Sequence, residues 1–399
     1  MNSRAPSPID TGSLSRRRFT ASALSAIAGW TGVSWTGADW TGTSRTGTSR
    51  TGTGGLVRQG IARGDDDPRP RRRNLKLGYD NFAVRAMGWK APGLLEYAAK
   101  LKTDSLFISD LDAFESLETP YLQSLRAKAA DRGLQIHVGT WSICPTSTTF
   151  RKTWGTAEEH LALGLRVAKD LGSPVLRVIL GNGGDRATPG GIEARIADTV
   201  KVCRACRSQS LDLGVKIAVE NHAGDMQAWE LVELIEAAGK DFVGANIDSG
   251  NAVWTFEDPL ANLEQLGPYA LTTSLRDSAI WESEKGVTVQ WTAMGDGSID
   301  WNAYFDTFEK LCPNVPVHIE TISGFNRELP LWTPDYWKNW PRARARDLAR
   351  FLPIARRGQP RPAWAPPAGT DRKEAERQYQ LDQIERSLSF CREKLGIRP

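Results

Sequence analysis

Acidic side chains end three apolar segments in the second half of the chain. Glu220 ends "VKIAVE", Asp248 ends "VGANID" and Glu320 ends "VPVHIE". Carboxylates at such positions can act as general acids and bases or as ligands of a divalent cation. Three of them in one place would repel each other strongly unless a positive charge lies among them. The spacing therefore predicts an acidic site that holds a cation.

A fourth apolar segment, "TTSLRDS" from Thr272 to Ser278, runs into a guanidinium and a carboxylate. Arg276 is suited to contacting a substrate oxygen or a developing oxyanion, with Asp277 orienting it. An internal salt bridge between the two residues is the alternative. Both Arg276 and Asp277 are predicted substrate-binding residues.

The elements that must position these residues alternate regularly from Leu75 onward. Short apolar runs are followed by patterns of helical period, which gives eight strand and helix pairs. The predicted strands are 75–80, 105–111, 134–141, 174–181, 215–221, 242–251, 269–277 and 315–323. This number and order predict an α/β fold of the closed (β/α)8 TIM-barrel type. An open doubly wound sheet is the alternative, but "GNGGDR" at Gly181 lacks the dinucleotide-binding spacing.

In a TIM barrel the reacting groups lie at the carboxyl ends of the strands, so these acidic residues belong to one mouth. His222 and Asn251, beside Glu220 and Asp248, are predicted to contact the substrate. His222 lies at or beyond its strand end, whereas His318 lies deeper and is interpreted as a core histidine. Trp291, Trp332, Trp337 and Trp340 come from irregular segments and suit either stacking on sugar rings or packing over the mouth.

Five short motifs at successive strand ends carry a family resemblance. They are "VENHAGD" at Val219, "NIDSGN" at Asn246, "TTSLRDS" at Thr272, "GDGSIDW" at Gly295 and "VHIET" at Val317. In this order they resemble the sugar phosphate isomerase/epimerase family of xylose isomerase-like TIM barrels. The resemblance implies a metal held by Glu, Asp, His and Glu.

Three of the implied metal ligands are present as Glu220, Asp248 and Glu320. The fourth position, where the family has His, is Ser274, and Asn251 stands where the neighbouring motif frequently ends in His. Oxygen-rich ligation suits Mn or Mg, and any imidazole shifts the preference toward Zn or Co. A neutral hydroxyl is a poor replacement for imidazole, which makes Ser274 a weak ligand.

The implied activity is metal-dependent isomerisation or epimerisation of a ketose or keto-sugar derivative. Glu220 and Glu320 would remove and return a proton across an enediolate. A lyase or decarboxylase acting on an oxidised sugar could use the same site, and a non-catalytic sugar-binding barrel is a further alternative. The absence of a clear phosphate-binding loop favours an unphosphorylated small-molecule sugar.

The first part of the chain has a different character. "SRRRFTASALSAIAG" places Arg16, Arg17 and Arg18 before a short apolar stretch, as in a twin-arginine export signal. We therefore expect a signal peptide at 1–29, a low-complexity linker at 30–73, the barrel at 74–358, and a C-terminal extension with a helix at 359–399. The predicted location is periplasmic or otherwise extracytoplasmic.

Composition excludes several other classes. The net charge of the chain is +4, but residues 1–63 alone carry eight Arg against two Asp, which leaves −2 for the rest. Such a body has no electrostatic footprint for nucleic acid. Nothing after residue 30 reaches the ~20 apolar residues of a membrane span. The five cysteines do not suggest a disulfide scaffold.

The charged C-terminal helix is expected to pack either on the barrel or against a partner copy in a homo-oligomer.

Overall fold

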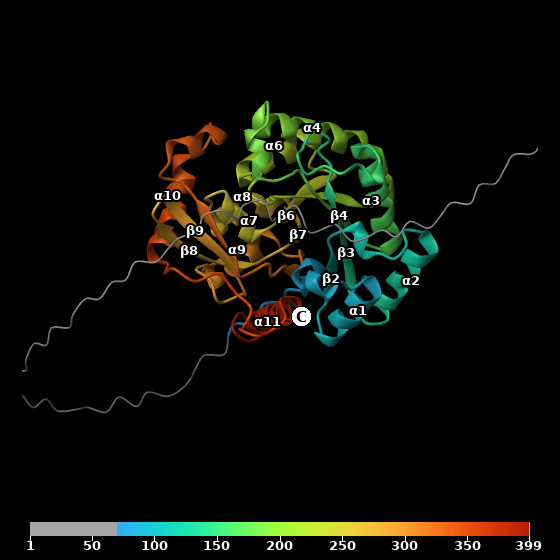
Figure 1. Cartoon of the computed structure of the whole chain (residues 1–399). Helices are drawn as coiled ribbons and strands as arrows, with labels where there is room; N and C mark the ends of the chain where they lie inside the picture. The colour runs from blue at the N-terminus through green and yellow to red at the C-terminus, as the bar shows by residue number, and fades with distance from the viewer. Residues whose placement is uncertain (1–69, 399) are drawn as a thin grey trace, which may run out of the picture. The chain divides into compact units, whose positions relative to one another are not determined.

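Eight parallel strands form the centre of the protein. The structure, a computed structural model, describes residues 70–398. The strands adjoin in the order β10-β1-β2-β3-β4-β5-β6-β7. Figure 1 labels five of them, β2, β3, β4, β6 and β7. They are β1 (Leu77–Asp80), β2 (Ser105–Ile108), β3 (Gln135–Ser142), β4 (Val175–Ile179), β5 (Lys216–Glu220), β6 (Val243–Ile247), β7 (Ala270–Thr273) and β10 (Val317–Ile319). Each predicted apolar run contributes one strand, and the predicted (β/α)8 barrel is confirmed.

The barrel closes between β7 and β10, just beyond the end of β7. Leu275 forms a parallel bridge with Ile319. Its N–H donates to the carbonyl of His318 at 2.7 Å, and its carbonyl accepts from the N–H of Glu320 at 2.9 Å. The closing contact therefore fixes the backbone in the middle of the TTSLRDS segment and beside Glu320.

Helices surround the strands, as Figure 1 shows for α1 to α4 and α6. They are α1 (Ala91–Lys100), α2 (Thr119–Ala130), α3 (Ala157–Leu171), α4 (Gly191–Ala205), α5 (Arg207–Leu213), α6 (Ala228–Ala238), α7 (Ser249–Trp254), α8 (Pro259–Leu266), α9 (Trp301–Leu311), α10 (Ala345–Arg357) and α11 (Arg372–Glu393). Cys206 separates two of these helices, because it caps the end of α4 and directly precedes α5. Cys203 and Cys206 are both buried in helix packing, with free thiols.

A second, antiparallel sheet occupies segments that were predicted to be irregular. It contains β8 (Asp277–Ser283), β9 (Gly286–Thr292) and β11 (Asn326–Leu329) in the order β11-β9-β8. Val287, Val289 and Trp291 alternate along β9 and are buried in a core cluster that includes Phe351 of α10. This alternation is the ordinary signal of a strand with one buried face. The expectation of an irregular segment was wrong there.

The C-terminal helix α11 packs on its own barrel. Ile384, Leu388 and Cys391 are buried in the main hydrophobic core. The Ser387 hydroxyl accepts from the N–H of Met294 at 3.0 Å, and Gln380 accepts from the N–H of Ala86 at 2.8 Å. The helix therefore supports the loop after β9 and the segment after β1, both of which lead toward the mouth of the barrel.

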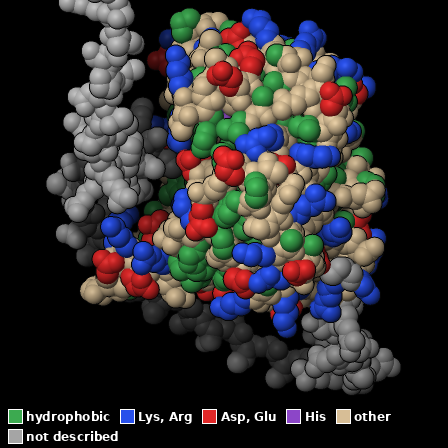
Figure 2. Space-filling model, turned by 90° about the vertical axis from the view of Figure 1, so that its right-hand side faces the viewer, with side chains coloured by type: hydrophobic (Ala, Val, Ile, Leu, Met, Phe, Trp, Pro, Cys, Tyr) green, Lys and Arg blue, Asp and Glu red, His purple; other side chains and the backbone are tan. Residues whose placement is uncertain are grey.

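The predicted signal peptide at 1–29 and almost all of the linker at 30–73 lie outside the described residues, and the proposed domain boundaries stay predictions. Within residues 70–398 no helix is both long and apolar enough to cross a bilayer. Basic and acidic side chains intermingle on the face seen in Figure 2, without a continuous patch of one sign. That face has the mixed character expected from the near-neutral charge of the body.

Candidate functional site

Polar side chains from six barrel strands or the residues directly after them meet at the carboxyl-terminal end of the barrel. A continuous set of hydrogen bonds and ion pairs joins them, and all are buried. The members, called the mouth cluster below, are Asp80, Arg177, Glu220, Asn246, Asp248, Asn251, Ser274, Arg276 and Glu320. The sequence indicated all of these except Asp80, Arg177 and Asn246.

Arg276 lies between two of the three predicted carboxylates. Its Nη2 donates to Oδ2 of Asp248 and to Oε2 of Glu320. Asp248 is held in place because it caps α7: its Oδ1 accepts from the N–H groups of Gly250 and Asn251 at 2.8 and 2.9 Å. Its second oxygen is thereby directed to the guanidinium. The positive charge that three carboxylates require is supplied here by an arginine.

A second arginine pairs with Glu220. Nε of Arg177 donates to Glu220 Oε2 at 2.5 Å, and its Nη1 donates to the carbonyl oxygens of Thr140 and Ser109 at 3.1 and 3.3 Å. The sequence carried a usable signal for this residue. Arg177 interrupts the apolar run "PVLRVILG", and a charged residue inside a strand buried on both faces needs a specific partner.

Two amides hold Glu220 from the other side. Asn246 Nδ2 donates to Glu220 Oε2 at 3.0 Å and to Ser274 Oγ at 3.2 Å. Asn251 Nδ2 donates to Glu220 Oε1 at 3.1 Å and to Asp248 Oδ2 at 2.6 Å. Both oxygens of Glu220 are thus engaged, which favours its ionised form.

The cluster drives the pKa values of its carboxyl groups apart. Burial raises the pKa of Glu320 well above its usual value, and nearby Asp80 and Asp248 raise it further against Arg276. Burial likewise raises the pKa of Asp248 to about 7, partly offset by Arg276. Burial acts in the same direction on Glu220 and is the largest single effect, but the nearby positive groups, Arg177 foremost, together outweigh it, so the pKa of Glu220 is lowered. One carboxylate is therefore held ionised while the other favours its protonated form, the usual condition for an acid and base pair.

Asp80 at the end of β1 is a further acidic member. Its Oδ1 accepts from the Ser109 hydroxyl and from the N–H of Phe82, both at 2.8 Å, and Ser274 Oγ lies 3.5 Å from its Oδ2. Burial raises the pKa of Asp80 to about 6, although Arg177 lowers it. Asp80 ends the strand "LGYD" as Glu220 ends the strand "VKIAVE". The position at a strand end, which predicted Glu220 as a site residue, therefore also indicates Asp80.

The expected metal ligands do not fit a divalent cation in this arrangement. Glu220 is paired with Arg177, and both Asp248 and Glu320 are paired with Arg276. The fourth position, Ser274, brings no charge. Among residues 70–398 no group of three or more His, Cys, Asp or Glu side chains is arranged to hold a metal. The carboxyl groups of the predicted metal centre are already paired with guanidinium groups.

Two nitrogens of the Arg276 guanidinium take no part in its pairing with Asp248 and Glu320. Nε and Nη1 are buried and have no hydrogen-bond partner among the described residues. The guanidinium carbon lies 4.3 Å from the ring centre of Trp291. A Cβ at Gly250 would lie 2.3 and 2.4 Å from Cγ and Cδ of Arg276, so only glycine lets this side chain pass. Leaving a buried donor unpaired costs about 1–3 kcal/mol, so these N–H groups favour an incoming oxygen.

His222 lies at the rim of the cluster and is half-buried. Its Nδ1 is 2.6 Å from the carbonyl oxygen of Gly181, so Nδ1 carries the proton and Nε2 is left as an acceptor. Burial lowers the pKa of His222, and Arg177 lowers it further against the attraction of Glu220. His222 is therefore a neutral imidazole at the mouth. His318, by contrast, lies inside the barrel and contacts Ser105 at 2.9 Å, as expected of a core histidine.

Asp277 does not orient Arg276, and that part of the prediction was wrong. Its Oδ2 accepts from the N–H groups of Gly295 and Gly297, both at 3.0 Å, and its Oδ1 accepts from Ser278 N at 2.7 Å. Burial raises the pKa of Asp277 to about 6. The residue organises the loop after β9, because the hairpin that begins at Asp277 turns its side chain toward that loop.

Comparison with known proteins agrees with this architecture. Residues 83–353 match the model of the xylose isomerase-like TIM barrel family. The match spans more than half of the chain, and the protein belongs to this family.

Three known proteins are similar to this chain at low sequence identity. The 3-oxo-isoapionate decarboxylase of Pectobacterium atrosepticum is 22% identical over 229 residues, which are 57% of this chain and 76% of that protein. The structure of a D-psicose 3-epimerase in the presence of D-fructose has a TM-score of 0.53 at 15% identity, covering 81% of this chain and 100% of that one. The IOLI protein with a bound zinc atom has a TM-score of 0.48 at 15% identity, covering 70% and 96%.

Proposed function

We propose that the protein is a sugar isomerase or epimerase that moves a proton at the carbon next to the carbonyl of a ketose or keto-sugar derivative. The observation that carries the proposal is Arg276, whose Nη2 joins Asp248 and Glu320 while its buried Nε and Nη1 have no partner in the described chain. Two such N–H groups beside an acid and base pair suit a carbonyl oxygen that becomes negative during reaction.

Each group has a role in this chemistry. Glu220, held ionised by Arg177, takes the proton from carbon, and the electron pair moves onto the carbonyl oxygen. Arg276 stabilises the resulting enediolate oxygen by charge and hydrogen bonding. Glu320, whose pKa is raised by burial, returns a proton to carbon. Return to the same carbon gives an epimer. Return to the neighbouring carbon, with the hydroxyl proton of the first carbon moving to the enediolate oxygen, gives an isomer.

In this proposal Arg276 supplies the positive charge for which the sequence had suggested Mn, Mg, Zn or Co. The support is the pairing of all three expected carboxylate ligands with arginines. His222, neutral and half-buried at the rim, and Asn251 are proposed to contact sugar hydroxyls. An unphosphorylated sugar remains the proposed substrate class.

A decarboxylase acting on an oxidised sugar is the second candidate. It is favoured by the relative from Pectobacterium atrosepticum, which is a 3-oxo-isoapionate decarboxylase. Loss of CO2 from a 3-oxo acid also places negative charge on the keto oxygen, where Arg276 would stabilise it, and a carboxylic acid such as Glu320 would then protonate the carbon. The same residues therefore serve either reaction, and the substrate decides between them.

The first test is hydrogen exchange in D2O with D-psicose, D-fructose and D-tagatose, followed by NMR. The wild-type protein should introduce deuterium next to the carbonyl. Glu220→Gln and Glu320→Gln should each slow exchange by about 10²–10⁴-fold, the usual contribution of a general acid or base. Glu309→Gln, which alters an ion pair with Arg73 away from the mouth cluster, is the matched control and should keep the rate.

Other results separate the candidates. Release of CO2 from 3-oxo-isoapionate, without deuterium exchange into ketoses, would replace the isomerase proposal by the decarboxylase. Binding of ketoses with neither reaction would indicate a non-catalytic sugar-binding barrel.

Export is proposed separately, since residues 1–29 lie outside the described part of the chain. The support is the order of Arg16, Arg17 and an apolar stretch in the sequence. Replacing Arg16, Arg17 and Arg18 by Lys should keep the protein in the cytoplasm of a host with twin-arginine transport. Unchanged recovery from the periplasm would contradict a twin-arginine route.

A further inference from the structure

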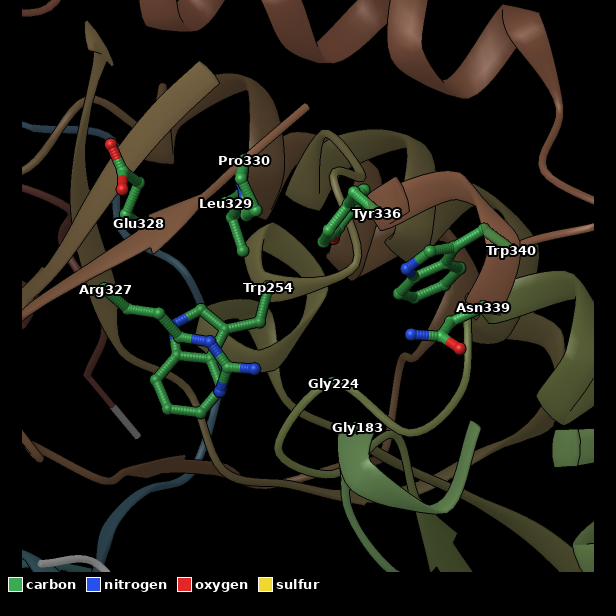
Figure 3. A pocket seen from close by; sticks show the side chains of 10 residues that line it. All are labelled: Gly183, Gly224, Trp254, Arg327, Glu328, Leu329, Pro330, Tyr336, Asn339 and Trp340. Atoms are coloured by element: carbon green, nitrogen blue, oxygen red, sulfur yellow. The ribbon is translucent and has the colours of Figure 1, made fainter. Parts of the chain in front are cut away.

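A small cavity, whose lining residues Figure 3 shows, contains no member of the mouth cluster in its lining. Its volume is about 190 Å³, below the roughly 300–1,000 Å³ of sites for drug-sized ligands. Its lining residues are Gly183, Gly224, Trp254, Arg327, Glu328, Leu329, Pro330, Tyr336, Asn339 and Trp340. The space suits one small polar ligand.

Two parts of the fold form its walls. Gly183 follows β4, Gly224 follows β5 and Trp254 ends α7 after β6, so one wall belongs to the carboxyl-terminal end of the barrel. The other wall is β11 and the 3-10 helix η6 (Pro334–Asn339), with Trp340 directly after it. The cavity is thus built where the added three-stranded sheet meets the barrel.

Arg327 is the positive charge of this cavity. Its guanidinium carbon lies 3.8 Å from the ring centre of Trp254. Among the ion pairs of the described residues none involves Arg327, although the other arginines near the mouth, Arg177, Arg186 and Arg276, all have carboxylate partners. Glu328, the acidic lining residue, is directed elsewhere and accepts from Ser283 Oγ at 3.3 Å.

The glycine pair keeps one side of this guanidinium open. A Cβ at Gly183 would lie 3.6 Å from Arg327 Nη2, and a Cβ at Gly224 would lie 3.5 Å from it. Either methyl group would cover the donor in van der Waals contact. In Figure 3 Arg327 and Trp254 lie across the cavity from Tyr336 and Trp340, whose rings give the opposite side an apolar surface.

The cavity and the mouth cluster are separated by a stack of rings. Trp254 stacks on Trp291 with 4.0 Å between ring centres and 9° between planes. Arg327 covers the free side of Trp254, and Arg276 lies 4.3 Å from the ring centre of Trp291. Two indoles therefore stand between the two guanidinium groups. A ligand held by Arg327 does not share the donors of Arg276.

We propose that this cavity is a separate binding site for a sugar acid, a monosaccharide unit that carries a carboxylate. Arg327 would hold the carboxylate through paired N–H donors, the geometry that a guanidinium matches best. Tyr336 and Trp340 would pack against the carbon-bound hydrogens of the ring. A phosphate group gathers several donors from different residues, whereas Arg327 is the only charged donor in the lining.

The test is calorimetric binding of D-glucuronate, D-glucose and inorganic phosphate to the full chain. Glucuronate should bind at least about tenfold tighter than glucose, since each 1.4 kcal/mol changes the affinity tenfold. Arg327→Gln should remove that difference. Arg344→Gln is the matched control because Arg344 also stacks on an indole, 4.1 Å from the ring centre of Trp229, away from the cavity lining. It should leave glucuronate binding unchanged.

A measurement on the wild-type chain keeps the test independent of folding of the variants. Raising the salt concentration should weaken glucuronate binding and leave glucose binding unchanged, because only the former uses a charge pair. Equal affinity for both sugars, glucuronate binding that survives Arg327→Gln, or phosphate binding as tight as that of glucuronate would each overturn the proposal. Glu220→Gln should retain glucuronate binding, so loss of the proposed catalytic function and loss of this site are distinguishable.

Discussion

Arg276 joins two carboxylates that would otherwise repel each other inside the barrel. Its side chain is 2% exposed and that of Asp248 is 0% exposed, so neither charge is solvated. Replacing one member of such a buried set leaves the others uncompensated. The same residue carries the unpaired N–H groups on which the proposed chemistry depends, so its contributions to stability and to activity must be measured separately.

Arg276→Met should lower the free energy of unfolding by about 3–5 kcal/mol at pH 8, the usual cost of breaking a buried ion pair. The loss should be smaller at pH 5, because the raised pKa values of Asp248 and Glu320 let both carboxyl groups become neutral there. Urea unfolding of both proteins at pH 8 and pH 5 measures this loss of unfolding free energy. Arg350→Met, which removes a pair with the half-exposed Glu264, should cost less than about 1 kcal/mol. A pH-independent loss for Arg276→Met would contradict the account.

Ser274 and Arg276 together should also determine whether the mouth holds a metal. The Ser274→His/Arg276→Met double variant frees Asp248 and Glu320 and adds an imidazole, so it should retain about one equivalent of Zn²⁺ after dialysis. The wild-type chain should retain much less. Adding Glu220→Gln to the double variant should remove the gain. Stoichiometric, tightly held metal in the wild type would show that Arg276 moves aside, and would contradict its assigned role.

At the scale of the elements, position in the barrel explains most of what could be predicted. The rule that reactive groups stand at strand ends located Glu220, Asp248 and Glu320, because these residues directly end or follow their apolar runs. Arg177 was missed because it lies within a strand and only its long side chain reaches the mouth. Asp277 was misassigned because a hairpin begins there, and strand pairing with β9 turns its carboxylate away. Side-chain direction in such irregular places depends on contacts between distant segments.

Gly250 in helix α7 leaves room for the Arg276 side chain of the mouth cluster, because glycine has no Cβ. Gly250→Ala should displace Arg276, because a Cβ would lie 2.3 Å from its Cγ. We expect a loss of about 1–3 kcal/mol in unfolding free energy, typical of overpacking, together with a marked fall in exchange rate. Gly93→Ala in α1 is the control, since its Cβ would come no closer than 3.5 Å to Trp89. It should stabilise by about 0.5–1 kcal/mol. Unchanged exchange in Gly250→Ala would argue against the placement of Arg276.

At the scale of the whole molecule, the protein buries acidic groups outside the mouth cluster as well. Glu257 accepts from the N–H of Ala228 at 3.0 Å and from Asn262 Nδ2 at 3.0 Å. Burial raises the pKa of Glu257 to about 8, and the negative charges of Asp347 and Glu230 contribute in the same direction. Such groups join the barrel to its surrounding helices, and they make the stability of the entire fold depend on pH.

The sign of that dependence follows from proton linkage. The pKa of Glu257 is about 8 when folded and about 4.3 when unfolded, so the folded state binds the proton more strongly. Its stabilising contribution is complete below about pH 4 and is lost as the pH rises through 8. Between pH 5.5 and 7.5 this group alone should lower the free energy of unfolding by up to roughly 2.7 kcal/mol. Glu257→Gln keeps the neutral shape and should reduce the slope measured by urea unfolding. Equal slopes in the two proteins would mean that Glu257 is ionised in the fold, with Asn262 and the Ala228 N–H compensating its charge.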